Sequence, residues 1–311
     1  MISTANLKEA LQSVTTIPLI PYRQGKIDYE AHRKNVRYLM ENNHLSGHRP
    51  RVVCIAGTSL IHHINNQEQN QLLAVSGSEM LDSGVLLSAI VPNPVSNIEI
   101  LVREQVSLQR PPDAFLIMPL GGVYSSEGLY EGLMQLGEQL GSRYNARLLF
   151  YHRNQRDHDQ VVRLIKDSDH WIGIKVGTNV DEVPSLVEEV GDSGLVIWGI
   201  GDRSTKAAQL GTTGHTSGIS VVYAKAGDEI NNAQLAGDYE KAYALEKRIH
   251  DLENIRFING REFNYSAVLE AMILSGYTDI DGGEGGPFNP RVSSEVSEIV
   301  RRAIEGLDDL H

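Results

Sequence analysis

The sequence predicts a parallel (β/α)8 barrel with a C-terminal helical extension. Short runs of β-branched and other apolar residues recur, and a segment of helix length with periodic apolar positions follows each run. The eight runs lie at residues 14–21, 51–56, 84–91, 114–118, 147–151, 171–175, 195–200 and 214–220. Eight regular repeats fit a closed barrel better than an open doubly wound sheet, which rarely needs so many.

An open Rossmann-type sheet is the alternative fold. Its nucleotide-binding fingerprints are missing, because no GxGxxG follows the first run and no GxxxxGK[ST] occurs in the sequence. The 311 residues would allow two domains by length alone, yet barrels of about 250 residues form one domain and tolerate added helices. The barrel is therefore favoured.

The pattern of the sequence changes after residue 222. Residues 224–250 are rich in Ala, Glu, Lys and Leu, and residues 263–274 and 293–307 are further helix-like stretches. We expect residues 1–222 to form the barrel and residues 223–311 to form a helical extension packed on it. The glycine-rich segment 282–287 predicts a flexible surface connection, with a phosphate-binding loop as the alternative.

Composition excludes several classes of protein. A net charge of −12 argues against a nucleic-acid groove or an anionic membrane surface, because both need clustered Lys and Arg. The single cysteine, Cys54, cannot form an intramolecular disulfide, and we expect it to fill the core. The N-terminus lacks the apolar run of a signal peptide, and no apolar stretch approaches about 18 residues. These features predict a globular, cytoplasmic protein.

Lys175 closes the sixth run, where a side chain would point into the mouth of the barrel. A partly dry pocket at that position favours the neutral amine, which is the form that attacks carbonyl carbons. Lys175 is therefore a candidate nucleophile for imine formation. The alternative is a lysine that extends from the strand end into solvent.

Tyr151 ends the fifth run and would reach the same mouth from the neighbouring strand. A phenol can donate and accept a proton through one oxygen, which suits it to serve the carbinolamine and the departing water. The alternative is a ring that packs at the barrel rim. After the second run, Gly57 would let backbone amides approach a ligand, and Thr58 and Ser59 could hold a carboxylate or cap the next helix.

This combination of a lysine, a tyrosine and a hydroxyl pair resembles the dihydrodipicolinate synthase / N-acetylneuraminate lyase family over nearly the whole chain. Residues 172–175 read IGIK, similar to the Schiff-base motif of the family, and Tyr151 falls on its catalytic tyrosine. Further similarity is found at residues 16–22, 25–29, 127–130, 267–274 and 287–290.

The resemblance implies a homo-oligomeric lyase, dimeric or tetrameric, that forms an imine with pyruvate or a related 2-oxo acid. Lys175, Tyr151 and Thr58 would be catalytic, and Gly57 and Ser59 would bind the substrate. The resemblance implies neither a metal nor an organic cofactor, and the expected partner is a small-molecule 2-oxo acid or sugar acid.

The chain departs from the family pattern at two places. The GTTGE turn of the family reads GTSLI at residues 57–61, so the second glycine and the glutamate are lost. The interface tyrosine of the family aligns with Gly121, and the nearest phenol is Tyr124. A literal GTTG string at residues 211–214 leads into the eighth run, so we interpret it as a coincidence of composition.

The other candidates for substrate binding are chosen by their position in the sequence. Arg156 has the spacing of the family arginine that binds the carboxylate of a second substrate, and Arg153 is its alternative. His62 and His63 could replace lost polar contacts or transfer protons near neutral pH, or they are exposed loop residues. Ser217 could contact substrate or cap a helix. Adjacent histidines seldom converge on one ion, so no metal site is expected.

Three functional hypotheses remain open at this stage. The first is a class I lyase or aldolase that acts on a 2-oxo acid. The second keeps the lysine imine but dehydrates a sugar acid. The third is a barrel with altered catalysis and a binding or regulatory role, which the Leu60 and Ile61 replacements in the turn would suit.

Overall fold

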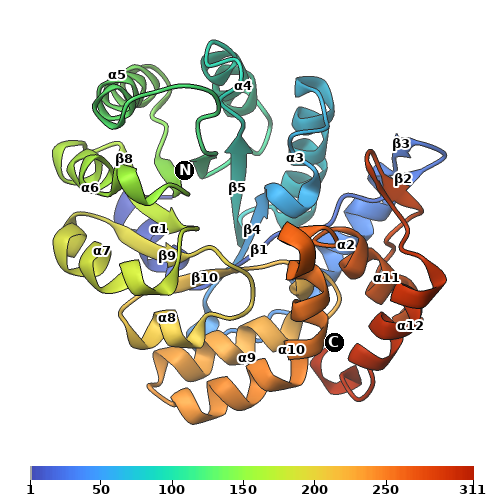
Figure 1. The fold of residues 1–311 in the computed structure, drawn as a ribbon. Helices are drawn as coiled ribbons and strands as arrows, with labels where there is room; N and C mark the ends of the chain where they lie inside the picture. The colour runs from blue at the N-terminus through green and yellow to red at the C-terminus, as the bar shows by residue number, and fades with distance from the viewer. Residues whose placement is uncertain (1) are drawn as a thin grey trace.

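The computed structural model describes residues 2–311 and shows a closed barrel of eight parallel strands (Figure 1). The strands are β1 (Val14–Thr16), β4 (Arg51–Ile55), β5 (Gly84–Ile90), β6 (Ala114–Ile117), β7 (Leu148–His152), β8 (Trp171–Val176), β9 (Leu195–Trp198) and β10 (Gly214–Ser217). β1 closes the ring because it pairs with both β4 and β10. Each predicted run overlaps one strand, and the predicted fold class is confirmed.

Every residue of the eight barrel strands is buried. Side chains fill the interior of the ring, and helices cover its outside. Both faces of each strand are therefore dry, which explains why the strands read as continuous apolar runs instead of alternating ones.

A helix follows each barrel strand, and the helices surround the strands in Figure 1. They are α2 (Tyr29–Glu41), α3 (Asn66–Met80), α4 (Asn97–Val106), α5 (Ser126–Tyr144), α6 (His158–Asp167), α7 (Val183–Val190), α8 (Thr205–Gln209) and α9 (Ala224–Leu235). Side-chain caps begin several of them; Asp28 accepts from the Ala31 amide at α2. A further helix, α1 (Thr4–Leu11), precedes β1. Within residues 2–311, no helix combines the length and apolar character needed to cross a bilayer.

The predicted helical stretch at residues 224–250 consists of two helices. α9 ends before Gly237, which adopts a left-handed φ of 73°, and α10 (Tyr239–Arg261) then runs back beside α9 (Figure 1). α11 (Ser266–Ser275) and α12 (Ser294–Ala303) complete the extension. The predicted division at residue 222 falls between β10 and α9, and it stays a prediction.

Two short hairpins connect the extension to the start of the chain. β2 (Tyr22–Arg23) pairs with β3 (Lys26–Ile27), and β11 (Gly285–Gly286) pairs with β12 (Asn289–Pro290). The Glu284 amide donates to the Tyr22 carbonyl at 2.8 Å, and the Glu284 carboxylate accepts from the Gln24 amide at 2.9 Å. The segment predicted to be a flexible connection is therefore anchored by long-range hydrogen bonds that its own sequence does not reveal.

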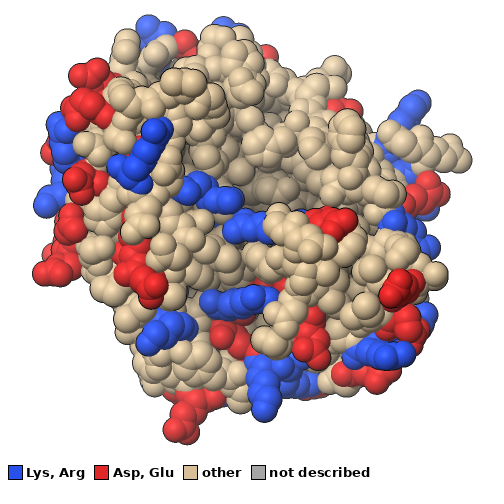
Figure 2. Space-filling model, in the orientation of Figure 1, with Lys and Arg blue, Asp and Glu red and all other residues tan. Residues whose placement is uncertain are grey.

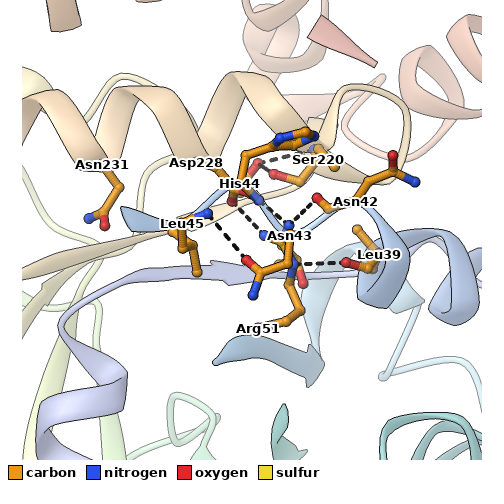
Figure 3. Close-up of polar contacts among 12 residues, drawn as sticks. Leu39, Asn42, Asn43, His44, Leu45, Arg51, Ser220, Asp228 and Asn231 are labelled. Carbon is orange, nitrogen blue, oxygen red and sulfur yellow. Dashed lines mark hydrogen bonds and ion pairs between the residues drawn. The ribbon is translucent and has the colours of Figure 1, made fainter. Parts of the chain in front are cut away.

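A buried ion pair joins the start of β4 to α9 (Figure 3). The Arg51 guanidinium contacts both carboxylate oxygens of Asp228, at 2.5 and 2.7 Å. Arg51 also donates to the carbonyls of Leu39 and Asn42, and the His44 amide donates to Asp228. Hydrogen bonds satisfy both charged side chains, so neither charge is buried without a partner. The ion pair thereby holds α9 against the barrel.

Candidate active site

Lys175 and Tyr151 lie side by side at the C-terminal ends of β8 and β7. They are register partners in the parallel pairing, so their side chains point to the same side of the sheet. The Lys175 Nζ lies 4.3 Å from the centre of the Tyr151 ring. The exposed fractions of the two residues are 7% and 5%. The amine and the phenol therefore share one nearly dry site.

Both side chains line a cavity of about 190 Å³ at the barrel mouth. Its lining comes from barrel strands, their loops and the C-terminal extension: Ile17, Gly57, Thr58, His62, Met118, Tyr151, Arg153, Lys175, Gly199, Gly201, Thr216, Gly218, Arg256, Phe257, Arg261 and Asn264. A second, much smaller cavity inside the barrel is lined by Lys175 together with Cys54, Leu87, Leu149 and other buried side chains. Burial raises the pKa of the Cys54 thiol to about 12, which fits the predicted role of this residue in the core.

The charge around Tyr151 favours its ionised form. Burial opposes ionisation, but the positive charges of Lys175, Arg153 and Arg261 outweigh burial and lower the pKa of Tyr151 to about 8. The Arg153 Nη1 donates to the phenol oxygen at 3.4 Å. A phenol with a pKa this close to neutral can both give and take a proton at physiological pH.

The turn after β4 supplies two of its three predicted contacts. Gly57 and Thr58 line the cavity. Ser59 is fully buried beneath them, where its Oγ donates to the Pro18 carbonyl at 2.7 Å and accepts from the Ala56 amide at 3.3 Å. Ser59 therefore holds the turn in place instead of facing a ligand.

His62 also lines the cavity, as predicted from its position in the sequence. Burial and the neighbouring His63 lower the pKa of His62, so the neutral imidazole prevails near neutral pH. The His63 ring lies 5.5 Å from the Phe288 ring, outside the cavity lining.

Comparisons with known proteins give similarity to one family. The model of the dihydrodipicolinate synthetase family matches residues 154–282, a segment that contains Lys175. The 4-hydroxy-tetrahydrodipicolinate synthase of Thermotoga neapolitana is 23% identical over 278 residues, which cover 86% of this chain and 90% of that protein. The protein of the same name from Aquifex aeolicus is 19% identical over 246 residues, 77% of this chain and 80% of its own.

Solved structures share the fold. A dihydrodipicolinate synthase from Oceanobacillus iheyensis superposes with a TM-score of 0.84 at 17% identity, covering 99% of this chain and 100% of that chain. Together, the family model and these relatives support membership of the dihydrodipicolinate synthase / N-acetylneuraminate lyase family, at low identity. The same similarity supports a class I aldolase-like lyase.

Among residues 2–311, Tyr151 is the one tyrosine that lines the cavity. Gly121, the position at which the resemblance would place a second tyrosine, is exposed, and Tyr124 does not line the cavity. The Tyr124 hydroxyl instead donates to the Asp157 carboxylate at 2.9 Å. Within this one chain, Tyr151 is the phenol that reaches Lys175.

The arginine at the family spacing does not reach the cavity. The Arg156 guanidinium carbon lies 4.5 Å from the centre of the Tyr124 ring, and its Nη2 donates to the Tyr124 carbonyl at 2.9 Å. Arg153, the alternative from the sequence, lines the cavity in its place. The structure therefore brings Arg153, and not Arg156, to Tyr151.

Ser217 lies at the end of β10 but does not line the cavity. Its Oγ bonds to the Ser220 hydroxyl at 2.5 Å and accepts from the Ser220 amide at 3.1 Å, a local turn contact. Its neighbours Thr216 and Gly218 are the lining residues. The literal GTTG string at residues 211–214 leads into the start of β10, at the opposite end of the barrel.

Sequence reasoning missed every lining residue that comes from the C-terminal extension: Arg256, Phe257, Arg261 and Asn264. They come from the end of α10 and the turn after it, within the helical extension. The Asn259-Gly260 dipeptide is a recognised break signal and could have predicted a turn there. No local signal, however, shows that this turn packs over the barrel mouth.

A backbone conformation that is rare for most residues places Arg261 in the cavity. The α10 helix is interrupted at Ile258, and the next three residues, Asn259, Gly260 and Arg261, have positive φ angles of 47°, 72° and 77°. Left-handed φ is unfavourable for a residue such as arginine. The Asn259 side chain donates to the Glu262 carboxylate at 3.0 Å and holds the turn.

One side-chain cluster has the donor set of a metal site. His152, His158 and Glu182 offer ligand atoms that all lie within 4.8 Å of one another. Glu182 Oε1 already accepts hydrogen bonds at 2.8 Å from both histidines, and Thr178 donates to the other oxygen. His152 follows Tyr151 and therefore points to the outer face of β7, away from Lys175. These residues could hold a divalent cation, but the Glu182 carboxylate already accepts hydrogen bonds from both histidines and from Thr178.

Proposed function

We propose that the chain is a Schiff-base-forming lyase of the class I aldolase type that acts on pyruvate or a related 2-oxo acid. The observation that carries the proposal is the placement of Lys175 Nζ 4.3 Å from the ring of Tyr151 in a buried cavity. A nearly dry amine beside an ionisable phenol is the arrangement that imine formation needs.

In the proposed mechanism, the Lys175 amine attacks C2 of the oxo acid and a C–N bond forms. The carbonyl electron pair moves to oxygen, which takes a proton from the Tyr151 phenol, while the nitrogen loses a proton. Protonation of the carbinolamine hydroxyl then releases water and leaves an iminium ion. In a 4-hydroxy-2-oxo acid, the C4 hydroxyl gives its proton to the Tyr151 phenolate and C4 leaves as an aldehyde, while the electrons of the breaking C3–C4 bond flow into the iminium. The enamine then takes a proton at C3, and addition of water to the resulting iminium releases pyruvate and restores the amine.

The turn after β4 is proposed to bind the substrate carboxylate. In the barrel order, β4 lies across the ring from β8, so Gly57 and Thr58 face Lys175 over the cavity. The Thr58 hydroxyl can donate to a carboxylate oxygen, and Gly57 leaves room for close backbone approach. Thr58 would thus orient C2 toward the amine.

The proposed chemistry requires no metal or organic cofactor, because the lysine itself provides the electron sink. Activity should therefore survive treatment with a chelator. We also propose self-association. It is supported by the exposed Val95, which lines an apolar cavity of about 110 Å³, and by the exposed Val123. Light scattering that gave only the 34.4 kDa monomer would contradict this part.

Borohydride trapping tests the imine. Incubation with pyruvate and a panel of other 2-oxo acids, followed by borohydride, should add the mass of the reduced adduct to the peptide that contains Lys175. Lys175→Ala should remove the adduct, whereas Lys166→Ala, at an exposed position on α6, should keep it. A Lys175 peptide of unchanged mass across the whole panel would refute the proposal.

Dehydration of a sugar acid through the same imine is a second candidate. The altered turn, which reads GTSLI at residues 57–61, favours it because the usual glycine and glutamate are replaced by Leu60 and Ile61. Product analysis separates the two candidates, since aldol cleavage of a 2-keto-3-deoxy sugar acid releases free pyruvate and dehydration does not.

A further inference from the structure

The cluster of His152, His158 and Glu182 lies outside the cavity, where the proposed chemistry does not use it. His152 is the last residue of β7, and His158 is the first residue of α6. Glu182 ends the single-turn helix η4 (Val180–Glu182), which follows β8. The three side chains therefore come from the loops that follow two neighbouring strands, and they meet although 30 residues separate His152 from Glu182.

The spacing of the three ligand atoms is close to what a metal ion needs. Glu182 Oε1 lies 2.8 Å from His152 Nε2 and 2.8 Å from His158 Nδ1. Ligand atoms about 2.1 Å from a tetrahedral zinc ion are about 3.4 Å from one another. Each contact would have to open by about 0.6 Å to admit the ion in place of the N–H hydrogens that point at Glu182.

Two of the three candidate ligands already have the outer contacts that are typical of metal sites. A metal-bound histidine usually donates its other ring N–H to a carboxylate or a carbonyl, and a metal-bound carboxylate is itself hydrogen-bonded. His158 Nε2 lies 3.2 Å from a Glu189 oxygen, and the Thr178 hydroxyl donates to the second oxygen of Glu182. These contacts would fix the directions of the His158 ring and of the Glu182 carboxylate.

The charges around the cluster also favour a cation. Within residues 2–311, neither Glu182 nor Glu189 forms an ion pair with a Lys or Arg side chain. When both imidazoles are neutral, the two carboxylates carry two negative charges, which one divalent cation would balance. The His158 side chain has an exposed fraction of 16%, so an ion can enter from solvent and a water molecule can complete its coordination.

The cavity at the barrel mouth has the opposite character. Among residues 2–311, its lining contains Lys175, Arg153, Arg256 and Arg261 but no Asp or Glu. Figure 2 shows Lys and Arg atoms beside the central hollow of this face. A metal cation would be repelled from the cavity, so the cluster and the imine site would take ligands of opposite charge.

We propose that His152, His158 and Glu182 bind one divalent transition-metal ion of the zinc class, which links the loops after β7 and β8. Imidazole nitrogens favour such metals over Mg²⁺ and Ca²⁺, which prefer oxygen ligands. The ion would brace the two strands that carry Tyr151 and Lys175. It would lie on the outer face of β7, away from the reacting atoms, so the inference does not depend on the proposed imine.

Zinc binding to the full chain tests the inference. The protein is prepared without a histidine tag, treated with a chelator and dialysed. Calorimetric titration should then give one Zn²⁺ per chain with a dissociation constant of about 1 µM or lower. At a hundredfold excess over that constant, Zn²⁺ should raise the melting temperature by about 5 °C, and Mg²⁺ should not. Co²⁺ should give the visible absorption of a four-coordinate ion.

Variants assign the ion to this cluster. His158→Gln and Glu182→Gln should each weaken Zn²⁺ binding by about a hundredfold or more, and Glu189→Gln, which removes an outer contact, by about tenfold. The control His250→Asn removes a histidine of α10 whose side chain has an exposed fraction of 58%, and it should keep the binding. His158 is less buried than Glu182, so its variant tests the inference even if the Glu182 variant misfolds.

The outcomes decide between a metal site and a hydrogen-bond network. If Zn²⁺ does not bind saturably at one per chain, the cluster is only a hydrogen-bond network and the inference is wrong. It is equally wrong if Zn²⁺ binds unchanged in both His158→Gln and Glu182→Gln, because the ion then lies elsewhere. Borohydride trapping on Lys175 below the melting temperature should be the same with and without Zn²⁺, so failure of the imine is detected separately.

Discussion

At the residue scale, the chemistry depends on one phenol whose surroundings differ from those of the other buried tyrosines. Burial raises the pKa of Tyr22, Tyr38 and Tyr265, because no comparable group of cations surrounds them. At Tyr151, three nearby cations reverse this effect and lower the pKa to about 8. Raising the pH through about 8 should therefore ionise Tyr151 before these three.

We predict that Tyr151→Phe slows imine formation by about 10²- to 10⁴-fold, the usual contribution of a positioned acid–base group. Stopped-flow or quench trapping measures the rate. An ultraviolet titration should show one tyrosinate forming near pH 8 in the unaltered protein, because the pKa of Tyr151 is lowered to about 8, and none there in the variant.

The control for this titration changes the cations and keeps the phenol. Arg261→Gln removes one positive charge, so the pKa of Tyr151 should rise and the tyrosinate should form at higher pH. An ionisation near pH 8 that persists in Tyr151→Phe would show that another group titrates there.

At the element scale, the end of β9 sets the position of the lysine. A Cβ at Gly199 would lie 2.7 Å from Lys175 Cγ and 2.8 Å from Lys175 Cε. It would also lie 2.5 Å from the Val176 carbonyl oxygen, which is backbone and cannot move aside easily. Because Gly199 has no side chain, the Lys175 side chain has room to extend into the cavity.

We predict that Gly199→Ala reduces borohydride trapping on Lys175 by about tenfold or more, because the added methyl group displaces the lysine stem. Mass spectrometry of the trapped peptide at a fixed time measures the loss. Gly132→Ala on α5 is the matched control, since a Cβ there meets nothing within 4 Å. Equal trapping by the two variants would contradict this account of the lysine position.

At the scale of the whole molecule, the barrel and its eighth helix are joined by the buried Arg51–Asp228 pair. Both side chains have an exposed fraction of 0%. Removal of one partner leaves the other charge buried and unpaired, which costs far more than loss of a surface pair.

We predict that Arg51→Met lowers the free energy of unfolding by about 3–5 kcal/mol, because the Asp228 charge stays buried without its partner. Urea denaturation measures the change. The double variant with Asp228→Leu should recover part of the loss, because neither charge remains. Arg163→Ala, which breaks an exposed pair with Glu127, should change stability by less than about 1 kcal/mol. A loss of less than about 1 kcal/mol in Arg51→Met would contradict the role given to the buried ion pair in stabilising the fold.

Much of the architecture could be predicted from the sequence. The eight barrel strands are buried on both faces, so their apolar runs mark them clearly. Consecutive strands of such a barrel are neighbours, and this is why Tyr151 and Lys175 could be expected to meet before any coordinates were known. The anchoring of residues 282–287 to Tyr22 could not be expected, because its partners lie far away along the chain.

The sequence by itself determined the barrel and the meeting of Lys175 with Tyr151, because both follow from local periodicity and from the order of neighbouring strands. Only the tertiary structure decided which cations surround that pair. Arg156 turns outward to Tyr124, whereas Arg261 reaches the cavity through a left-handed turn at the end of α10. The charge of the cavity therefore depends on how a distant helix packs over the barrel mouth, and no local pattern in the sequence encodes that packing.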